Sequence, residues 1–234
     1  MSKATGPTHL APPEGIGDLR RERLGWARLY FVCEALPHGR DPEPMLQAAL
    51  AGGAGMVELR DRDVPEDALQ RAAGTFRRLA DTHSALFIVN DDPHLARELG
   101  ADGVHVGQDD MDPAEARSIL GPDAIIGLST HSPEQVGTAQ EQPVDYVSVG
   151  PIWQTPTKEG RPATGLDLLG RAAESSRLPW FAIGGIDEEN VEQVVAAGAR
   201  RICVVRAIRD AENPRGAAAA LLAPIEAAVA REPT

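Results

Sequence analysis

One pattern repeats eight times between residue 27 and the end of the chain: a short apolar run, a turn residue, and then a stretch with helical spacing. Most of the apolar runs are under seven residues long and rich in Val and Ile, which is typical of parallel strands that are buried on both faces. The expected strands are 27–34, 55–60, 85–90, 103–107, 124–129, 145–150, 180–185 and 201–206.

Helix-start signals stand between the expected strands. Proline recurs at a first-turn position, and an Asp or Ser comes directly before the last three of these prolines, where a capping oxygen is needed. The prolines are Pro65, Pro93, Pro113 and Pro133. The expected helices are 42–52, 65–82, 93–99, 113–120, 132–140, 166–176, 187–197 and 214–230.

Eight strand–helix units within 234 residues predict one α/β domain, a single (β/α)8 TIM barrel. An open, doubly wound sheet is the rival architecture, but no GxGxxG motif follows the first strand, and eight units are many for it. We expect the barrel to span 26–230. Residues 1–25 would form a short N-terminal tail, partly disordered because its first half is rich in Pro, Gly and small polar residues. Residues 231–234 are the C-terminal end.

Composition narrows the partners that we expect. The formal charge of −12 argues against nucleic acid. No apolar run approaches the length of a membrane span, and the N-terminus lacks the apolar core of a signal peptide. Cys33 and Cys203 lie inside apolar runs, and we expect both to be buried free thiols. The chain is therefore expected to be cytoplasmic, with no membrane partner.

The end of the second expected strand carries three charged side chains. Because side chains alternate along a strand, Glu58, Arg60 and Arg62 point the same way, and chemistry in such a barrel sits where the strands end. Two arginines and a carboxylate suit a phosphate ligand and an orienting partner. A surface ion-pair cluster is the alternative.

Surplus carboxylates follow the third and fourth strands. Asp92 and Asp112 come just before prolines and are expected to cap helices, which leaves other polar residues at the two strand ends. Carboxylates from neighbouring loops repel each other unless a cation joins them, and Mg²⁺ is commonly held by one or two carboxylates plus substrate phosphate oxygens. Solvated caps are the alternative. The residues left over are Asn90, Asp91, Asp109 and Asp110.

The fifth and sixth strands are followed by hydroxyls and a lysine. Ser129 can donate to a ligand, whereas His131 is either a general acid or base or a solvated turn residue. The long loop after the sixth strand offers Thr155, Thr157 and Lys158, and Lys158 is the one lysine outside the N-terminal tail. A lysine is a compact point charge that can follow a phosphate. His105, within the fourth strand, is expected to pack inward.

The seventh and eighth strands end in features that suit a monophosphate. Barrels of this kind commonly bind phosphate after these two strands, with glycine amides and a helix N-terminus. Gly184 and Gly185 follow the seventh strand, and Val205 and Arg206 end the eighth. A tight turn is the alternative reading of the glycine pair.

These motifs resemble the thiamine phosphate synthase family, in family order and over about residues 28–225. The matching stretches are ELRDR, IVNDD, VHVGQDD, GLSTHS, VGPIWQTPTKEG, AIGGI and VVRAI. The resemblance implies a (β/α)8 enzyme that joins a hydroxymethylpyrimidine diphosphate to a thiazole phosphate. It implies a dissociative mechanism, Mg²⁺ as cofactor, small phosphorylated substrates and self-association into a homo-oligomer.

The resemblance also implies a role for each site residue. Mg²⁺ would be held on the diphosphate by Asp91 and Asp110. The diphosphate would be gripped by Arg60, Arg62, Asn90 and Lys158, and the pyrimidine contacted by Ser129, with Glu58 in the same subsite. The catalytic residues would be Lys158, Arg60 and Ser129. The thiazole phosphate would be held by Thr155, Thr157, Gly185, Val205 and Arg206.

Three positions depart from the family pattern. Glu58 stands where Gln is usual, Arg62 replaces Lys, and Arg206 replaces a small Ser. An ionised Glu only accepts hydrogen bonds, whereas Gln can donate and accept. Two other functions stay open: a thiazole tautomerase-like relative that binds only the thiazole phosphate, and a non-catalytic barrel that binds a phosphorylated ligand.

Overall fold

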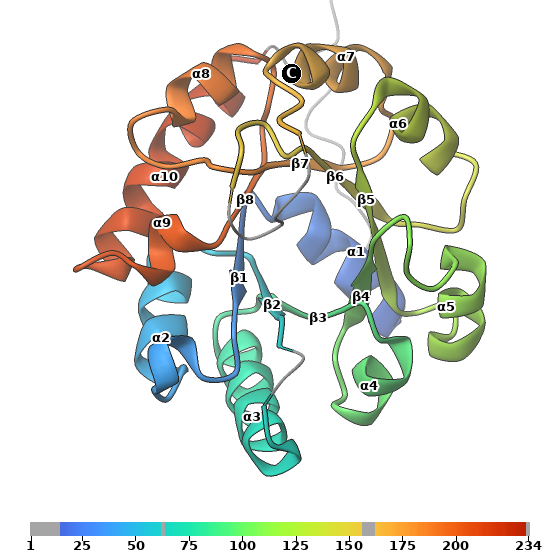
Figure 1. Cartoon of the computed structure of the whole chain (residues 1–234), viewed down its shortest axis with the longest axis vertical. Coiled ribbons are helices and arrows are strands. Elements are labelled where there is room, and N and C mark those ends of the chain that lie inside the picture. Colours follow the sequence, from blue (N-terminus) through green and yellow to red (C-terminus); the bar gives the residue numbers. More distant parts are fainter. Residues whose placement is uncertain (1–14, 62–63, 156–161, 233–234) are drawn as a thin grey trace, which may run out of the picture.

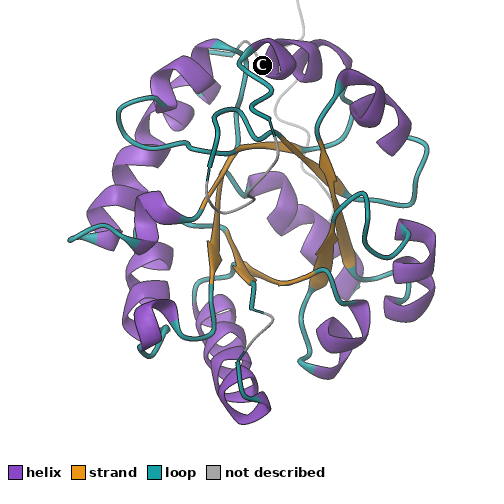
Figure 2. Cartoon of the chain, in the orientation of Figure 1, coloured by secondary structure: helices purple, strands orange, loops and turns teal. Residues whose placement is uncertain are grey.

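The computed structural model describes residues 15–61, 64–155 and 162–232. Its strands form a closed barrel of eight parallel strands in sequence order, surrounded by helices (Figures 1 and 2). This confirms the predicted (β/α)8 fold. The strands are β1 (Leu29–Cys33), β2 (Met56–Leu59), β3 (Leu86–Asn90), β4 (Gly103–Val106), β5 (Ile125–Thr130), β6 (Tyr146–Val149), β7 (Trp180–Ile183) and β8 (Ile202–Val204).

The helices alternate with the strands, and most begin within two residues of the predicted position. They are α1 (Ile16–Trp26), α2 (Glu43–Ala51), α3 (Glu66–Thr82), α4 (Pro93–Glu98), α5 (Pro113–Leu120), α6 (Pro133–Ala139), α7 (Asp167–Ser175), α8 (Val191–Ala196), α9 (Arg206–Arg209) and α10 (Pro214–Val229), with a short 3-10 helix, η1 (Pro37–Gly39). The predicted caps are confirmed, because the side chains of Asp92, Asp112 and Ser132 each accept from a backbone N–H of the helix that follows.

Two local expectations are wrong. The helix expected from residue 187 begins only at Val191, because Asp187 accepts a hydrogen bond from the Glu189 backbone and holds a turn there. Residues at the end of the eighth predicted strand form α9 instead, so Arg206 is the first residue of a short helix.

Apolar side chains pack in two places. One core lies between the strands and the outer helices, and the other fills the inside of the barrel. Both cysteines are buried and neither forms a disulfide, as predicted. The interior cluster includes Tyr30, Met56, Leu86, Ile88, Ile125, Tyr146, Phe181 and Cys203.

Helix α1 crosses the amino-terminal end of the barrel and is visible through the ring in Figure 1. It places Leu24 against the interior core. Arg20 Nε lies 2.9 Å from Asp102 Oδ1, and Arg21 Nε lies 3.0 Å from Asp145 Oδ1. The chain leading into the barrel therefore seals the end opposite the carboxyl ends of the strands.

Within the described ranges, no helix is both long and apolar enough to span a membrane.

Candidate active site

A cavity of about 320 Å³ opens at the carboxyl ends of the strands. Each of the eight strands contributes at least one side chain to its wall, so the cavity is the mouth of the barrel. Its lining includes Tyr30, Val32, Glu58, Arg60, Asn90, His105, Ser129, His131, Ser148, Thr155, Ile183, Gly184, Gly185, Cys203, Val205 and Arg206.

Most of the predicted site residues meet in this one cavity. Those that line it are Glu58, Arg60, Asn90, Ser129, Thr155, Gly185, Val205 and Arg206. Asp91 and Asp110 follow β3 and β4 but are not part of its lining. Arg62, Thr157 and Lys158 lie outside the described residues, so their predicted roles stay predictions.

Glu58 lies at the floor of the cavity with only 3% of its surface exposed. The Tyr30 hydroxyl donates a hydrogen bond to Glu58 Oε2 and lies 3.1 Å from the Tyr146 hydroxyl. Burial, and after it the negative charge of Glu58, raises the pKa of both tyrosine hydroxyls well above their usual range. Both tyrosines therefore keep their protons and can donate.

His105 continues this chain of contacts to Ser129. Its Nδ1 lies 3.1 Å from the Tyr146 hydroxyl, and its Nε2 lies 3.0 Å from Ser129 Oγ and 3.3 Å from Ser148 Oγ. Gln108 Nε2 donates to the Ser129 carbonyl at 2.6 Å. His105 faces inward as expected, but it lines the cavity floor rather than serving only as packing.

Asp91 and Asp110 follow β3 and β4, which pair side by side, so both stand at one corner of the carboxyl end of the barrel. The Asp91 backbone N–H donates to the His105 carbonyl at 2.7 Å, which ties Asp91 to β4. Asp110 Oδ2 accepts from the Gly107 N–H at 2.8 Å, just past the end of β4. Asp91 also has a positive φ of 63°, uncommon for a residue with a side chain.

This corner fits Mg²⁺ by the chemistry of its donors. Both side chains offer carboxylate oxygens, and Mg²⁺ binds through one or two carboxylates with water and substrate phosphates as the other ligands. Among the described residues no group of three or more metal-ligating side chains occurs. A cation here would therefore take its other oxygens from water and the substrate.

The opposite wall is built from the β7 end. Gly184 and Gly185 adopt positive φ values of 106° and 70°. A Cβ on Gly184 would lie 2.5 Å from Pro151 Cα, so only glycine lets the loop after β6 approach this closely. Asn190 Nδ2 donates to the Gly185 carbonyl at 2.8 Å and fixes the turn.

Arginines mark the rim beside β8. Arg60, Arg206 and Arg209 also line a neighbouring pocket of about 330 Å³. Arg209 Nη1 pairs with Glu34 at 2.6 Å, whereas neither Arg60 nor Arg206 forms an ion pair within the described part of the chain. Two cations of the mouth are thus available to an anionic ligand.

Sequence reasoning missed part of the floor. Tyr30, Tyr146 and Ser148 sit inside apolar strands and were not singled out, although polar atoms on inward-facing strand positions are a usable signal. His131 is not a solvated turn residue, because its Nδ1 contacts the Gly150 carbonyl and the residue lines the cavity.

A closed (β/α)8 barrel whose mouth gathers arginines, hydroxyls and glycines is typical of one class of protein, the barrel enzymes that act on phosphorylated small molecules. Residues 29–208 match the family described as thiamine monophosphate synthase. The chain belongs to this family.

Individual relatives agree with this assignment. The chain is 48% identical over 212 residues to the thiamine-phosphate synthase of Thermobifida fusca, covering 90% of this chain and 97% of that one. It is 50% identical over 198 residues to the thiamine-phosphate synthase of Thermus thermophilus, covering 83% and 95%. The solved structure of thiamine phosphate pyrophosphorylase from Pyrococcus furiosus is 31% identical, with a TM-score of 0.79 over 89% of this chain and 98% of that one.

Proposed function

We propose that this chain is a thiamine-phosphate synthase. It would join 4-amino-2-methyl-5-hydroxymethylpyrimidine diphosphate to 4-methyl-5-(2-phosphoethyl)thiazole, carboxylated or not, and release diphosphate. The observation that carries the proposal is that one cavity gathers residues predicted for both substrates, in a chain that belongs to this family.

The pyrimidine diphosphate would bind on the β2 to β5 side. Arg60 and Asn90 would hold the diphosphate, together with Arg62 and Lys158 on segments outside the described residues. Glu58 and Ser129, deep on the floor, would hold the pyrimidine ring.

Asp91 and Asp110 would hold Mg²⁺, which would neutralise part of the diphosphate charge when bound.

The thiazole phosphate would bind on the β6 to β8 side. Gly185 and the Val205–Arg206 backbone would offer amide hydrogens, and Arg206 would add a positive charge. Thr155 lines the same cavity and would offer a hydroxyl, with Thr157 on the adjoining segment outside the described residues.

The chemistry needs charge stabilisation more than a base. The bond between the methylene carbon and the diphosphate oxygen breaks, and its electron pair leaves on the diphosphate. Arg60 would stabilise that developing charge, and a cation formed deep in the cavity would be shielded from water by the walls and the bound substrates. The thiazole nitrogen then supplies the electron pair of the new carbon–nitrogen bond.

The test is to mix purified full-length chain with both substrates and Mg²⁺ and to measure thiamine phosphate and diphosphate. We expect equal amounts of the two products. Folded protein that makes neither would overturn the proposal, and binding without turnover would favour the non-catalytic barrel. We further propose that the chain is cytoplasmic and that it forms a homo-oligomer. Light scattering of the purified chain measures the mass of the assembly and so tests the oligomer.

A further inference from the structure

Five side chains form a continuous hydrogen-bonded line at the base of the cavity, which we call the floor chain. In order they are Glu58, Tyr30, Tyr146, His105 and Ser129. Four of them line the cavity, and Tyr146 is fully buried. They come from five strands on opposite sides of the ring (Figure 1). Every member is at most 7% exposed, so water competes little with these contacts.

If Glu58 is ionised, every hydrogen bond of the floor chain must be donated toward Glu58, because a carboxylate only accepts. Tyr30 gives its single proton to Glu58, so its oxygen must accept from Tyr146. Tyr146 has then used its own proton, so its oxygen must accept from His105 Nδ1–H. Both tyrosines keep their protons, because their pKa is raised.

The last hydrogen bond of the floor chain sets the orientation of the Ser129 hydroxyl. A neutral His105 with its proton on Nδ1 has a bare Nε2, which must accept from a hydroxyl. Ser129 Oγ lies 3.0 Å from that nitrogen, with Ser148 Oγ at 3.3 Å. We assign the donor to Ser129, the nearer of the two hydroxyls, so that its proton points toward the histidine and its oxygen offers lone pairs to the cavity.

Packing holds the floor chain in place. The Tyr146 and His105 rings stack with centroids 5.4 Å apart, and Phe181 packs edge-on against Tyr30 at 5.5 Å and Tyr146 at 5.6 Å. Rings fixed on three sides leave little freedom to reorient the hydroxyls.

We propose that Glu58, acting through the floor chain, makes the cavity floor a set of hydrogen-bond acceptors. Such a floor selects a flat heterocycle whose edge presents donors, namely an exocyclic amino group and a protonated ring nitrogen. It rejects the same ring with a carbonyl in place of the amino group. Tyr30, Tyr146 and His105 are then positioning residues, because their hydrogen bonds fix the orientation of the Ser129 hydroxyl relative to Glu58.

The inference rests on the proposed function only for the identity of the ring, an aminopyrimidine. The preference for donors can be measured without turnover. The two probes are 4-amino-5-hydroxymethyl-2-methylpyrimidine and its 4-oxo analogue, titrated separately into the full chain by ligand-observed NMR or calorimetry.

We expect the wild-type chain to bind the amino compound about 10- to 100-fold more tightly than the oxo compound, the effect of hydrogen bonds to a charged group. Glu58→Gln keeps the shape but can donate, so the preference falls to within a few-fold. Equal affinity in the wild type, an unchanged preference in Glu58→Gln, or no binding of either compound would overturn the inference.

A second measurement tests the direction of the hydrogen bonds in the floor chain through the tautomer of His105. The ¹⁵N spectrum of the histidines, with His105 assigned by a His105→Gln variant, reports which ring nitrogen carries the proton. We expect Nδ1–H in the wild type, and a mixture of tautomers in Glu58→Gln and Tyr30→Phe, while the other five histidines stay unchanged. A wild-type signal from Nε2–H or from a doubly protonated ring would contradict the assigned direction.

These outcomes separate the inference from the proposed synthase. A chain that prefers the amino compound but makes no thiamine phosphate keeps the inference and refutes the synthase. A chain that turns over both substrates but binds both probes equally does the reverse. Thermal unfolding of each variant shows whether a lost preference is only lost folding.

Discussion

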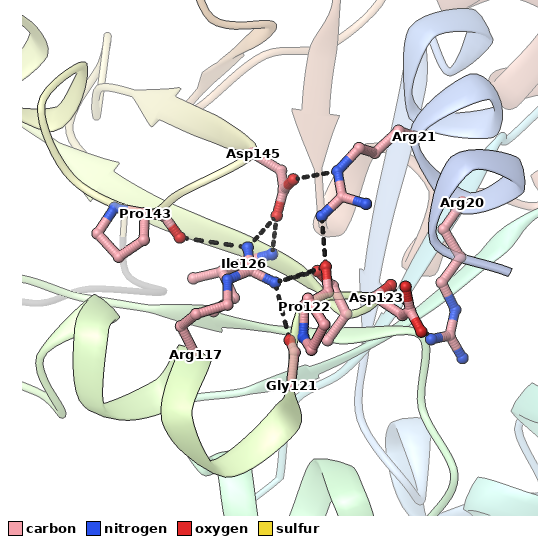
Figure 3. A network of polar contacts seen from close by, with 10 residues as sticks. Arg20, Arg21, Arg117, Gly121, Pro122, Asp123, Ile126, Pro143 and Asp145 are labelled. Atoms are coloured by element: carbon pink, nitrogen blue, oxygen red, sulfur yellow. Dashed lines mark hydrogen bonds and ion pairs between the residues drawn. The ribbon is translucent and has the colours of Figure 1, made fainter. Parts of the chain in front are cut away.

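The two ends of the barrel differ in the partners of their arginine side chains. At the end sealed by α1, Asp145 accepts from Arg21 at 3.0 Å, from Arg117 at 2.6 Å and from the Ile126 backbone at 2.8 Å (Figure 3). At the open mouth, Arg60 and Arg206 have no carboxylate partner among the described residues. Charges matched within the chain serve stability, and charges left for a ligand serve binding. The variants below test this contrast.

The largest effect should come from the mouth. Arg60→Ala removes a cation that we place on the leaving diphosphate, and we expect kcat/KM to fall about 10²- to 10³-fold, as for the loss of one preorganised electrostatic contact. The free energy of unfolding should change by no more than about 0.5 kcal/mol, because this side chain forms no ion pair with another described residue. Steady-state kinetics and urea unfolding measure the two quantities.

Arg60→Lys is the matched control, because it keeps the charge but not the planar fork. We expect it to recover part of the lost activity. If Arg60→Ala were as active as the wild type, the assignment of this residue to the diphosphate would be wrong.

At the sealed end the expected effect is on stability. Asp145→Ala leaves two arginines and a backbone N–H without their acceptor (Figure 3). We expect a loss of about 2–3 kcal/mol, below the ~3–5 kcal/mol of a fully buried pair, because the Arg21 side chain is 41% exposed. Activity per folded molecule should not change. A large loss of kcat/KM at full folding would show that the two ends are coupled.

Substitution of Gly184, at the mouth, should change both the stability of the fold and the binding of substrate. Ala at position 184 needs a φ near 106° and places its Cβ 2.5 Å from Pro151 Cα. We expect about 1–3 kcal/mol of destabilisation and a higher KM for the thiazole phosphate. The control is Gly170→Ala, in helix α7, where a Cβ meets nothing within 4 Å. That change should stabilise by about 0.5–1 kcal/mol. Similar melting temperatures for the two variants would contradict the role given to Gly184.

The smallest change in stability should come from Asp112, which follows β4 and caps a helix. Asp112 Oδ1 accepts from the Ala114 N–H at 2.8 Å and caps α5. Asp112→Ala should cost about 1 kcal/mol, and Asp112→Asn, which keeps a capping oxygen, should cost much less. Equal losses in the two variants, measured by urea unfolding, would mean that the charge matters and the cap does not.

The fold could be predicted from the sequence because its signals are local. Short apolar runs locate each strand, and a capping side chain before proline locates α4, α5 and α6. The start of α8 was misplaced because the same cap-like Asp187 holds a turn instead. Helix α1 occupies most of the second half of the segment expected as an N-terminal tail. Its position had no local signal, because its contacts are with Asp102 and Asp145, more than 80 residues away.

The strand-end residues of the site were predictable from the sequence, Glu58 and Ser129 on the floor included, whereas the tyrosines inside the strands were not. Residues at strand ends are identified by the barrel rule alone, and most of those that the structure describes line the cavity, whereas Asp91 and Asp110 do not. The link from Glu58 to Tyr30 depends on which strands are neighbours, here β2 and β1, and on their register, in which Val32 pairs with Glu58. For a tyrosine inside an apolar strand, the sequence does not show which residue its hydroxyl will hydrogen-bond.

The most direct test of the contrast between the two ends is the double variant Arg60→Ala with Arg20→Ala, a mild change at the sealed end, where Arg20 pairs with Asp102. Its kcat/KM and free energy of unfolding are compared with those of the two single variants. Independent ends predict losses that add to within about 0.5 kcal/mol for both quantities. A larger departure from additivity would contradict the division between a mouth that binds and an end that stabilises.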